Sequence, residues 1–343
     1  MKRKPDLLPD GSIDYAREYD NSGRVADAAA LIDAYETDAA RFRAAEATEA
    51  QLGRVYGPGE RNRLDLFWPD DERGKRRRSP IVVFIHGGYW QRLDRSAFSH
   101  MAKGLNGKGI AVALPSYTLC PENTVAGIIH EMRRACLLLW QTHRRKLVVI
   151  GHSAGGHLAA CMFATDWPSI HEDLPADLVC AGMGLSGLYD LEPLRETPVN
   201  DALGLDAEAA RAASPVFMTP PPLHRFEAWV GGEESAEYHR QSNLLAERWT
   251  MLATPTNVHS VAGENHFTIV DALTDPASAM VQTIVELVND PSPHVAVPRP
   301  EPGAVAALMQ GLPSTAAPSG SEEAEEQPER EDGEEEQEEQ AVE

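Results

Sequence analysis

Apolar residues along the chain follow two alternating patterns. Between residues 63 and 290, short runs such as IVVFI (81–85) and LVVI (147–150) alternate with stretches of helical spacing such as 124–143 and 235–252. Runs that are apolar throughout are typical of strands covered on both faces, and their alternation with helices predicts βαβ units. We therefore expect an α/β fold, a mostly parallel, doubly wound sheet with helices on both faces.

The two ends of the chain lack this alternation. Residues 1–62 contain one helical stretch, residues 25–52, and we expect this N-terminal segment to pack on or cap the α/β core of residues 63–290. Residues 291–343 are Pro-rich at first and end in a low-complexity acidic sequence without core-forming residues. Such a composition predicts a linker followed by a disordered tail.

The charge balance bears on the class of partner. The net charge is −22, but residues 321–343 hold 13 Asp/Glu and one Arg, which leaves −10 for the rest of the chain. This ordinary acidity argues against nucleic acid, because binding to phosphates requires a basic face. We interpret the one basic run, residues 75–78, as a solvated loop before a strand.

The cellular compartment is predicted from what the sequence lacks. No apolar run is long enough to span a membrane, and the basic N-terminus has no apolar region behind it. The four cysteines are widely spaced and form no CxxC pair, which is typical of reduced thiols in the cytosol. We expect a cytoplasmic protein that does not bind membranes; a homodimer is compatible with the sequence, which does not fix the oligomeric state.

The sequence GHSAGGH (151–157) joins an apolar strand run to a helical stretch. A serine at such a strand-turn-helix elbow presents its hydroxyl at the carboxyl edge of the sheet. The turn requires strained backbone angles at the serine and residues without bulk two positions before and after it. Gly151 and Gly155 stand at those positions, so Ser153 is the predicted nucleophile.

A nucleophilic serine requires a histidine base and donors for the oxyanion. The motif HGGYW ends the strand of residues 81–85 and comprises His86, Gly87, Gly88, Tyr89 and Trp90. The backbone N–H groups of Gly88 and Tyr89 are expected to form the oxyanion hole together with that of Ala154. His266 lies in the loop after the last predicted strand, where the base of such a fold is expected.

The acid that orients the histidine has three candidates. Glu234 follows a predicted strand and precedes His266 by 32 residues, Glu233 is adjacent to it, and Asp190 ends the preceding strand. We favour Glu234, with the other two left open. The sequence has no HExxH motif and no Cys/His cluster with ligand spacing, so we expect neither a metal nor an organic cofactor.

These motifs resemble those of the kynurenine formamidases of the α/β-hydrolase superfamily. HGGYW matches their HGGxW motif, whereas related hormone-sensitive-lipase-like esterases usually carry a third glycine in place of Tyr89. The segments YDNSGRV, SYTLCPE, GHSAGGHLAA, SGLYDLEPL and EESAEYHRQS look like the same family, so that the resemblance covers most of residues 15–290. The family's acid is an aspartate whose position falls on Glu234, and the change to glutamate is a departure from the pattern.

The resemblance implies an arylformamidase that hydrolyses N-formyl-L-kynurenine to L-kynurenine and formate. Ser153 would attack the formyl carbonyl and form a formyl-serine intermediate, with His266 as the base. Tyr89 and Trp90 could wall a pocket for an aryl formamide or ester, although Trp90 equally fits a place in the core. Two alternatives stay open: a short-acyl carboxylesterase with the same triad, and a catalytically inactive hydrolase fold used as a binding module.

Overall fold

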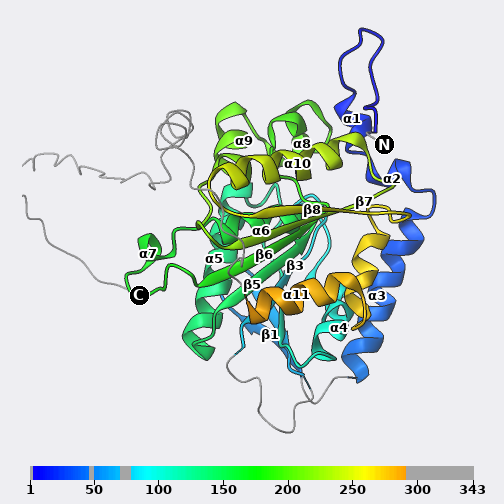
Figure 1. Cartoon of the computed structure of the whole chain (residues 1–343). Coiled ribbons are helices and arrows are strands. Elements are labelled where there is room, and N and C mark those ends of the chain that lie inside the picture. Colours follow the sequence, from blue (N-terminus) through cyan, green and yellow to red (C-terminus); the bar gives the residue numbers. More distant parts are fainter. Residues whose placement is uncertain (1–2, 46–49, 70–78, 291–343) are drawn as a thin grey trace, which may run out of the picture. The chain divides into compact units, whose positions relative to one another are not determined.

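The computed structural model describes residues 3–45, 50–69 and 79–290 (Figure 1). These residues belong to one compact unit. The predicted linker and tail of residues 291–343 and the basic run of residues 75–78 lie outside the described residues.

An eight-stranded sheet forms the centre of the unit, with the strand order β1-β2-β4-β3-β5-β6-β7-β8. The strands are β1 (Ala50–Val55), β2 (Arg63–Phe67), β3 (Ile81–Ile85), β4 (Val112–Pro115), β5 (Leu147–His152), β6 (Val179–Leu185), β7 (Arg225–Gly231) and β8 (Thr256–Val261). Pairing is parallel from β4 to β8, and β2 is antiparallel to both β1 and β4. The prediction of an α/β fold with a mostly parallel sheet is confirmed.

The apolar runs occupy the middle of this sheet. β3 lies between β4 and β5, and Val83 pairs in register with Ala113 on one side and Val149 on the other. Every residue of β3, β5 and β6 is buried, because helices cover both faces. Burial on both faces explains why these strands show no alternation of apolar and polar residues.

Helices pack on the two faces of the sheet around two apolar clusters (Figure 1). One face carries α3 (Ala28–Ala45), the 3-10 helix η1 (Arg95–Ala102), α4 (Lys103–Asn106), η4 (Thr268–Thr274) and α11 (Ala279–Asn289). The other carries α5 (Val125–His143), α6 (Ala154–Phe163), α7 (Trp167–Ile170), η2 (Glu192–Glu196), α8 (Asn200–Leu203), α9 (Ala207–Ala213), η3 (Pro215–Phe217) and α10 (Ala236–Met251). Within the described ranges, no helix combines the length and apolar character that a membrane crossing requires.

The N-terminal segment differs from the prediction in one element. The helix expected over residues 25–52 ends at Ala45, and Ala50–Val55 form strand β1, which pairs antiparallel with β2. The helix predicted over residues 50–52 is therefore wrong, and the sheet already begins at Ala50. Residues 50–52 favour a helix by their composition, but the energy of this preference is small compared with that of backbone pairing to β2. Gly53 takes a φ of 67°, which a right-handed helix does not contain.

Helix α3 fixes the N-terminal segment on the sheet. The ring of Tyr35 lies 5.3 Å from that of Phe98, and the ring of Phe42 lies 5.3 Å from that of Phe67. The Tyr35 hydroxyl donates a hydrogen bond to the backbone oxygen of Phe267. Residues before the sheet thus pack against the loop that follows β8. The short helices α1 (Tyr15–Glu18) and α2 (Asn21–Arg24) precede α3.

Two fully buried histidines link the stability of this fold to pH. Burial lowers the pKa of His86 and of His157 to about 4, although their hydrogen bonds to backbone oxygens oppose the shift. Between pH 6.5 and 4 the unfolded chain binds protons at these positions and the folded chain does not. Each histidine therefore reduces the free energy of unfolding as the pH falls through this range.

Replacing His157 should reduce this pH dependence. We expect the slope of unfolding free energy against pH, measured by urea denaturation between pH 6.3 and 5.0, to be smaller in His157→Gln by up to ~1.4 kcal/mol per pH unit. The exposed His171→Gln variant is the control, and its slope should match that of the unaltered protein. Other titrating groups are common to the three proteins, so identical slopes in all three would contradict the prediction.

Candidate active site

Ser153 sits at the tight turn between β5 and α6. Its φ of 57° and ψ of −120° are strained for a residue with a side chain. A Cβ atom on Gly151 would lie 2.1 Å from the backbone oxygen of Gly155, and one on Gly155 would lie 1.9 Å from that of Ile85. Neither position can carry a side chain. The two glycines predicted from the sequence therefore allow β3, β5 and α6 to meet at Ser153.

The HGGYW loop (residues 86–90) reaches this turn from β3. A Cβ atom on Gly87 would lie 3.0 Å from the Cβ of Ser153, so the loop backbone runs directly beside the serine. Gly88, Tyr89 and Trp90 have φ values of 104°, 51° and 58°. Three successive residues in the left-handed region turn the chain sharply, and such strain is concentrated at functional sites.

Three backbone N–H groups near Ser153 remain available as donors. Across the described part of the chain, no acceptor is assigned to the N–H of Gly88, Tyr89 or Ala154. Ala154 is the first residue of α6, where the N–H groups have no partner within the helix. These are the donors expected for an oxyanion hole, and Gly88 and Tyr89 line the same cavity as Ser153.

His266 and Glu234 form a buried hydrogen-bonded pair. The Nδ1 of His266 lies 2.7 Å from the Oε2 of Glu234, and both residues are buried. The other carboxylate oxygen of Glu234 accepts a hydrogen bond of 2.6 Å from the N–H of Gly231 and one from the hydroxyl of Ser186. Both carboxylate oxygens are thus fixed, and the pair holds the Nδ1 proton of His266 away from the cavity.

The other two candidate acids lie elsewhere. Glu233 has a side chain 60% exposed and pairs with Arg3 at 2.7 Å, and Asp190 pairs with Arg240 at 3.2 Å. Neither forms a hydrogen bond with His266 in the described structure. The turn after β7 directs Glu234 inward and Glu233 to solvent, which explains why two adjacent glutamates differ in environment.

His152 supports the loop that carries His266. Its Nε2 lies 2.8 Å from the backbone oxygen of His266, and the two rings are 4.8 Å apart. Burial and the neighbouring His266 lower the pKa of His152 well below its usual value. His152 is therefore neutral and donates this hydrogen bond. The sequence placed His152 in the elbow without indicating this contact.

The hydroxyl of Tyr89 belongs to a buried network that sequence reasoning missed. It donates to the backbone oxygen of Tyr19 at 2.6 Å and lies 2.8 Å from the hydroxyl of Tyr238. The side-chain amide of Asn21 donates to Tyr238 at 2.7 Å and to Tyr89 at 3.2 Å. The partners of Tyr89 lie in YDNSGRV and EESAEYHRQS, so the resemblance to the formamidases was the signal that could have found them.

The same network joins the N-terminal segment to the start of α10. The hydroxyl of Tyr19 donates to Glu237 at 2.9 Å and accepts from Gln241 at 2.8 Å. Glu18 accepts a hydrogen bond from the backbone N–H of Glu237 at 2.9 Å. The ring of Tyr238 lies 4.6 Å from that of His266. Residues 18–21, α10, the HGGYW loop and His266 are thereby connected through buried contacts.

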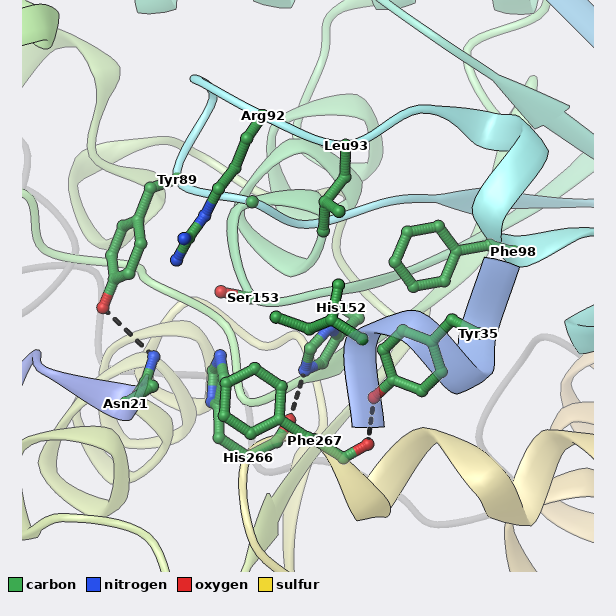
Figure 2. Close-up of a pocket in the computed structure, with 12 residues that line it drawn as sticks. Asn21, Tyr35, Tyr89, Arg92, Leu93, Phe98, His152, Ser153, His266 and Phe267 are labelled. Carbon is green, nitrogen blue, oxygen red and sulfur yellow. Dashed lines mark hydrogen bonds between the residues drawn. The ribbon is translucent and has the colours of Figure 1, made fainter. Parts of the chain in front are cut away.

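A cavity of about 30 Å³ contains Ser153 and His266 (Figure 2). Five of its other lining residues are aromatic or apolar: Ile32, Tyr35, Leu93, Phe98 and Phe267. Tyr89 lines it as expected, whereas Trp90 is fully buried with its ring 5.0 Å from that of His157. The volume accepts about two water molecules, so a larger molecule must extend beyond this space or displace lining side chains.

Several known proteins are similar to this chain in sequence or in fold. The family model BD-FAE matches residues 64–174. The kynurenine formamidase of Danio rerio is 28% identical over 72% of this chain and 85% of its own length. A probable isoprenylcysteine alpha-carbonyl methylesterase of Oryza sativa is 29% identical over 41% of this chain and 36% of its own. The crystal structure of a putative thioesterase from Silicibacter sp. TM1040 is 34% identical, with a TM-score of 0.70, over 79% of this chain and 99% of that one.

A mostly parallel sheet, a serine elbow after β5 and a histidine after the last strand define an α/β hydrolase. The chain acts as a hydrolase on a small-molecule substrate. Its similarity to kynurenine formamidases over 85% of their length confirms the family resemblance predicted from its motifs.

The pairing of Glu234 with His266 predicts a large effect on activity. In Glu234→Gln the amide cannot stabilise a protonated His266, and we expect kcat for p-nitrophenyl acetate to fall about 1,000- to 10,000-fold. Glu233→Gln makes the same chemical change at the exposed neighbour and should stay within about twofold of the unaltered enzyme. Equal losses in both variants would contradict the assignment of Glu234.

The buried hydroxyl of Tyr89 should contribute to stability. Tyr89→Phe leaves the Tyr19 oxygen and Asn21 without this partner, and we expect urea unfolding to show a loss of about 1–3 kcal/mol. Tyr15→Phe is a matched control, because among the described residues the Tyr15 hydroxyl has no hydrogen-bond partner. A Tyr89→Phe protein as stable as the control would show that the network contributes nothing.

Proposed function

We propose that Ser153, His266 and Glu234 form the catalytic triad of an arylformamidase that hydrolyses N-formyl-L-kynurenine to L-kynurenine and formate. The observation that carries this proposal is the buried hydrogen bond between His266 and Glu234, behind a cavity that His266 shares with a strained Ser153. The choice of substrate rests on the relatives from Danio rerio and Salmo salar. Both are named kynurenine formamidase and are matched over 85% of their length.

The reaction begins with proton transfer from the Ser153 hydroxyl to the Nε2 of His266 as the oxygen attacks the formyl carbon. Glu234 holds Nδ1 and stabilises the imidazolium that forms. The arrangement requires no movement of the carboxylate, since Gly231 and Ser186 already fix it. Preorganisation of this kind lowers the barrier because no solvent or side chain reorients during the step.

In the tetrahedral intermediate the former carbonyl oxygen carries a negative charge, which backbone N–H groups beside Ser153 would stabilise. We assign the oxyanion hole to the N–H groups of Gly88, Tyr89 and Ala154, which have no acceptor among the described residues. Removal of one such donor typically costs about 100- to 1,000-fold in kcat. The network behind Tyr89 supports this assignment, because it holds the strained loop in one conformation.

Collapse of the intermediate breaks the C–N bond of the formamide. His266 gives its proton to the departing arylamine, and Ser153 keeps the formyl group as an ester. His266 then accepts a proton from water as the water oxygen attacks the formyl-serine. Return of this proton to the Ser153 oxygen breaks the ester C–O bond, releases formate and restores the free serine. The aromatic lining from Tyr35, Phe98 and Phe267 suits the aryl part of the substrate.

A carboxylesterase is the second candidate function. Its support is the similarity to the isoprenylcysteine alpha-carbonyl methylesterases and to the putative thioesterase, since all of these names denote ester or thioester hydrolysis. The triad proposed here would cleave an ester by the same steps. The two functions differ in the acyl and leaving groups that the lining accepts.

The kinetics of two substrates separate these functions. We expect kcat/KM for N-formyl-L-kynurenine to exceed that for p-nitrophenyl acetate at least tenfold, measured by kynurenine absorbance and nitrophenolate release. Hydrolysis of the ester without hydrolysis of the formamide would overturn the arylformamidase and support the carboxylesterase.

Labelling of Ser153 tests whether the protein is catalytically active at all. A fluorophosphonate probe should label the unaltered protein and the Ser169→Ala control, whose exposed serine lies on α7, but not Ser153→Ala. Absence of label on the unaltered, folded protein would favour an inactive hydrolase fold that serves as a binding module.

We also propose a cytoplasmic location, with small molecules rather than nucleic acid as ligands. The four cysteines are free and buried, which suits a reducing compartment. The acidity of the body of the chain disfavours binding to phosphate backbones.

A further inference from the structure

Arg92 is the one residue with a permanent charge among those that line the cavity of Ser153. Within the described part of the chain, its side chain forms no ion pair and no hydrogen bond. Other arginines around the same loop are neutralised: Arg61 pairs with Asp94 at 3.3 Å and Arg95 with Asp65 at 3.0 Å. Arg92 is exposed, and unlike these neighbouring arginines its guanidinium is not held by a carboxylate of the described residues.

The direction of the side chain relates this charge to the site. Figure 2 shows the guanidinium of Arg92 extending from the loop into the space between Tyr89 and Ser153. No carboxylate lines the cavity among the described residues, and Glu234 stands behind His266 with both oxygens occupied. An anion that enters the cavity thus meets one cation and no competing negative side chain.

We propose that Arg92 binds a carboxylate of the substrate and makes the enzyme selective for aryl formamides that carry one. This inference rests on the proposed function, because N-formyl-L-kynurenine joins an aryl formamide and an α-carboxylate in one molecule. The planar guanidinium offers two parallel N–H donors that match a carboxylate. The aromatic side chains of the lining contact the ring of the substrate, Ser153 attacks the formyl carbon, and Arg92 binds the carboxylate.

A structural role of Arg92 would give a different result from a binding role. Its backbone N–H donates to the oxygen of Gly88 at 3.1 Å, and its Cγ lies close over Gly88. If the side chain only supported the oxyanion loop, its loss would slow all substrates equally. The informative quantity is therefore the ratio of kcat/KM between an anionic and a neutral substrate.

The experiment compares N-formyl-L-kynurenine with its α-carboxamide in the full-length protein, with formate release as the readout. We expect the ratio of kcat/KM, anionic over neutral, to fall about 10- to 100-fold in Arg92→Gln, mainly through KM. Arg92→Lys keeps the charge but not the planar guanidinium, and its ratio should lie between those of the unaltered enzyme and Arg92→Gln. The matched control is Arg41→Gln on α3, whose side chain is 73% exposed, and it should leave the ratio unchanged.

The outcomes separate the two proposals. If Arg92→Gln leaves the ratio of kcat/KM unchanged, because both substrates lose equally or neither loses, carboxylate recognition by Arg92 is overturned. The proposed arylformamidase activity is not affected by that result. If the unaltered enzyme hydrolyses neither formamide, the proposed function fails, and the role of Arg92 fails with it.

Discussion

The close approach of three backbone segments at Ser153 is the constraint on which the rest of the structure depends. Gly155 lies so near the oxygen of Ile85 that β3 and α6 touch without side chains between them. This contact brings the end of β3 beside the end of β5, and the HGGYW loop consequently starts next to the serine. The strain at Ser153 and in the loop persists because buried strands on both sides hold the chain ends in place.

Much of the fold follows from the sequence for a simple physical reason. Strands covered on both faces must be apolar throughout, so β3 and β5 are visible as runs, and α5 and α10 are visible by their helical spacing. β1 is an edge strand without a buried face and carries no such signal. Its formation depends on β2, which only the folded chain supplies.

In the site, too, some residues could be predicted from the sequence and others depend on tertiary contacts. Ser153 and His266 are marked by their place after strands, because the topology brings the carboxyl ends of parallel strands together. Glu233 and Glu234 share a chemistry and differ only in the direction that the turn gives them, which the sequence does not encode locally. The contacts of Tyr19 and Asn21 with α10 join residues more than 200 positions apart, beyond any local pattern.

The hydroxyl of Tyr89 joins the N-terminal segment to the HGGYW loop. Its hydrogen bond ends on the backbone of Tyr19, and Asn21 completes the set. A glycine in place of Tyr89 would leave Asn21 and Tyr238 buried with fewer partners, at a cost in stability. Tyr19, Asn21, Tyr89 and Tyr238 therefore form one buried polar unit, in which the loss of any hydroxyl or amide leaves polar atoms of the others without partners.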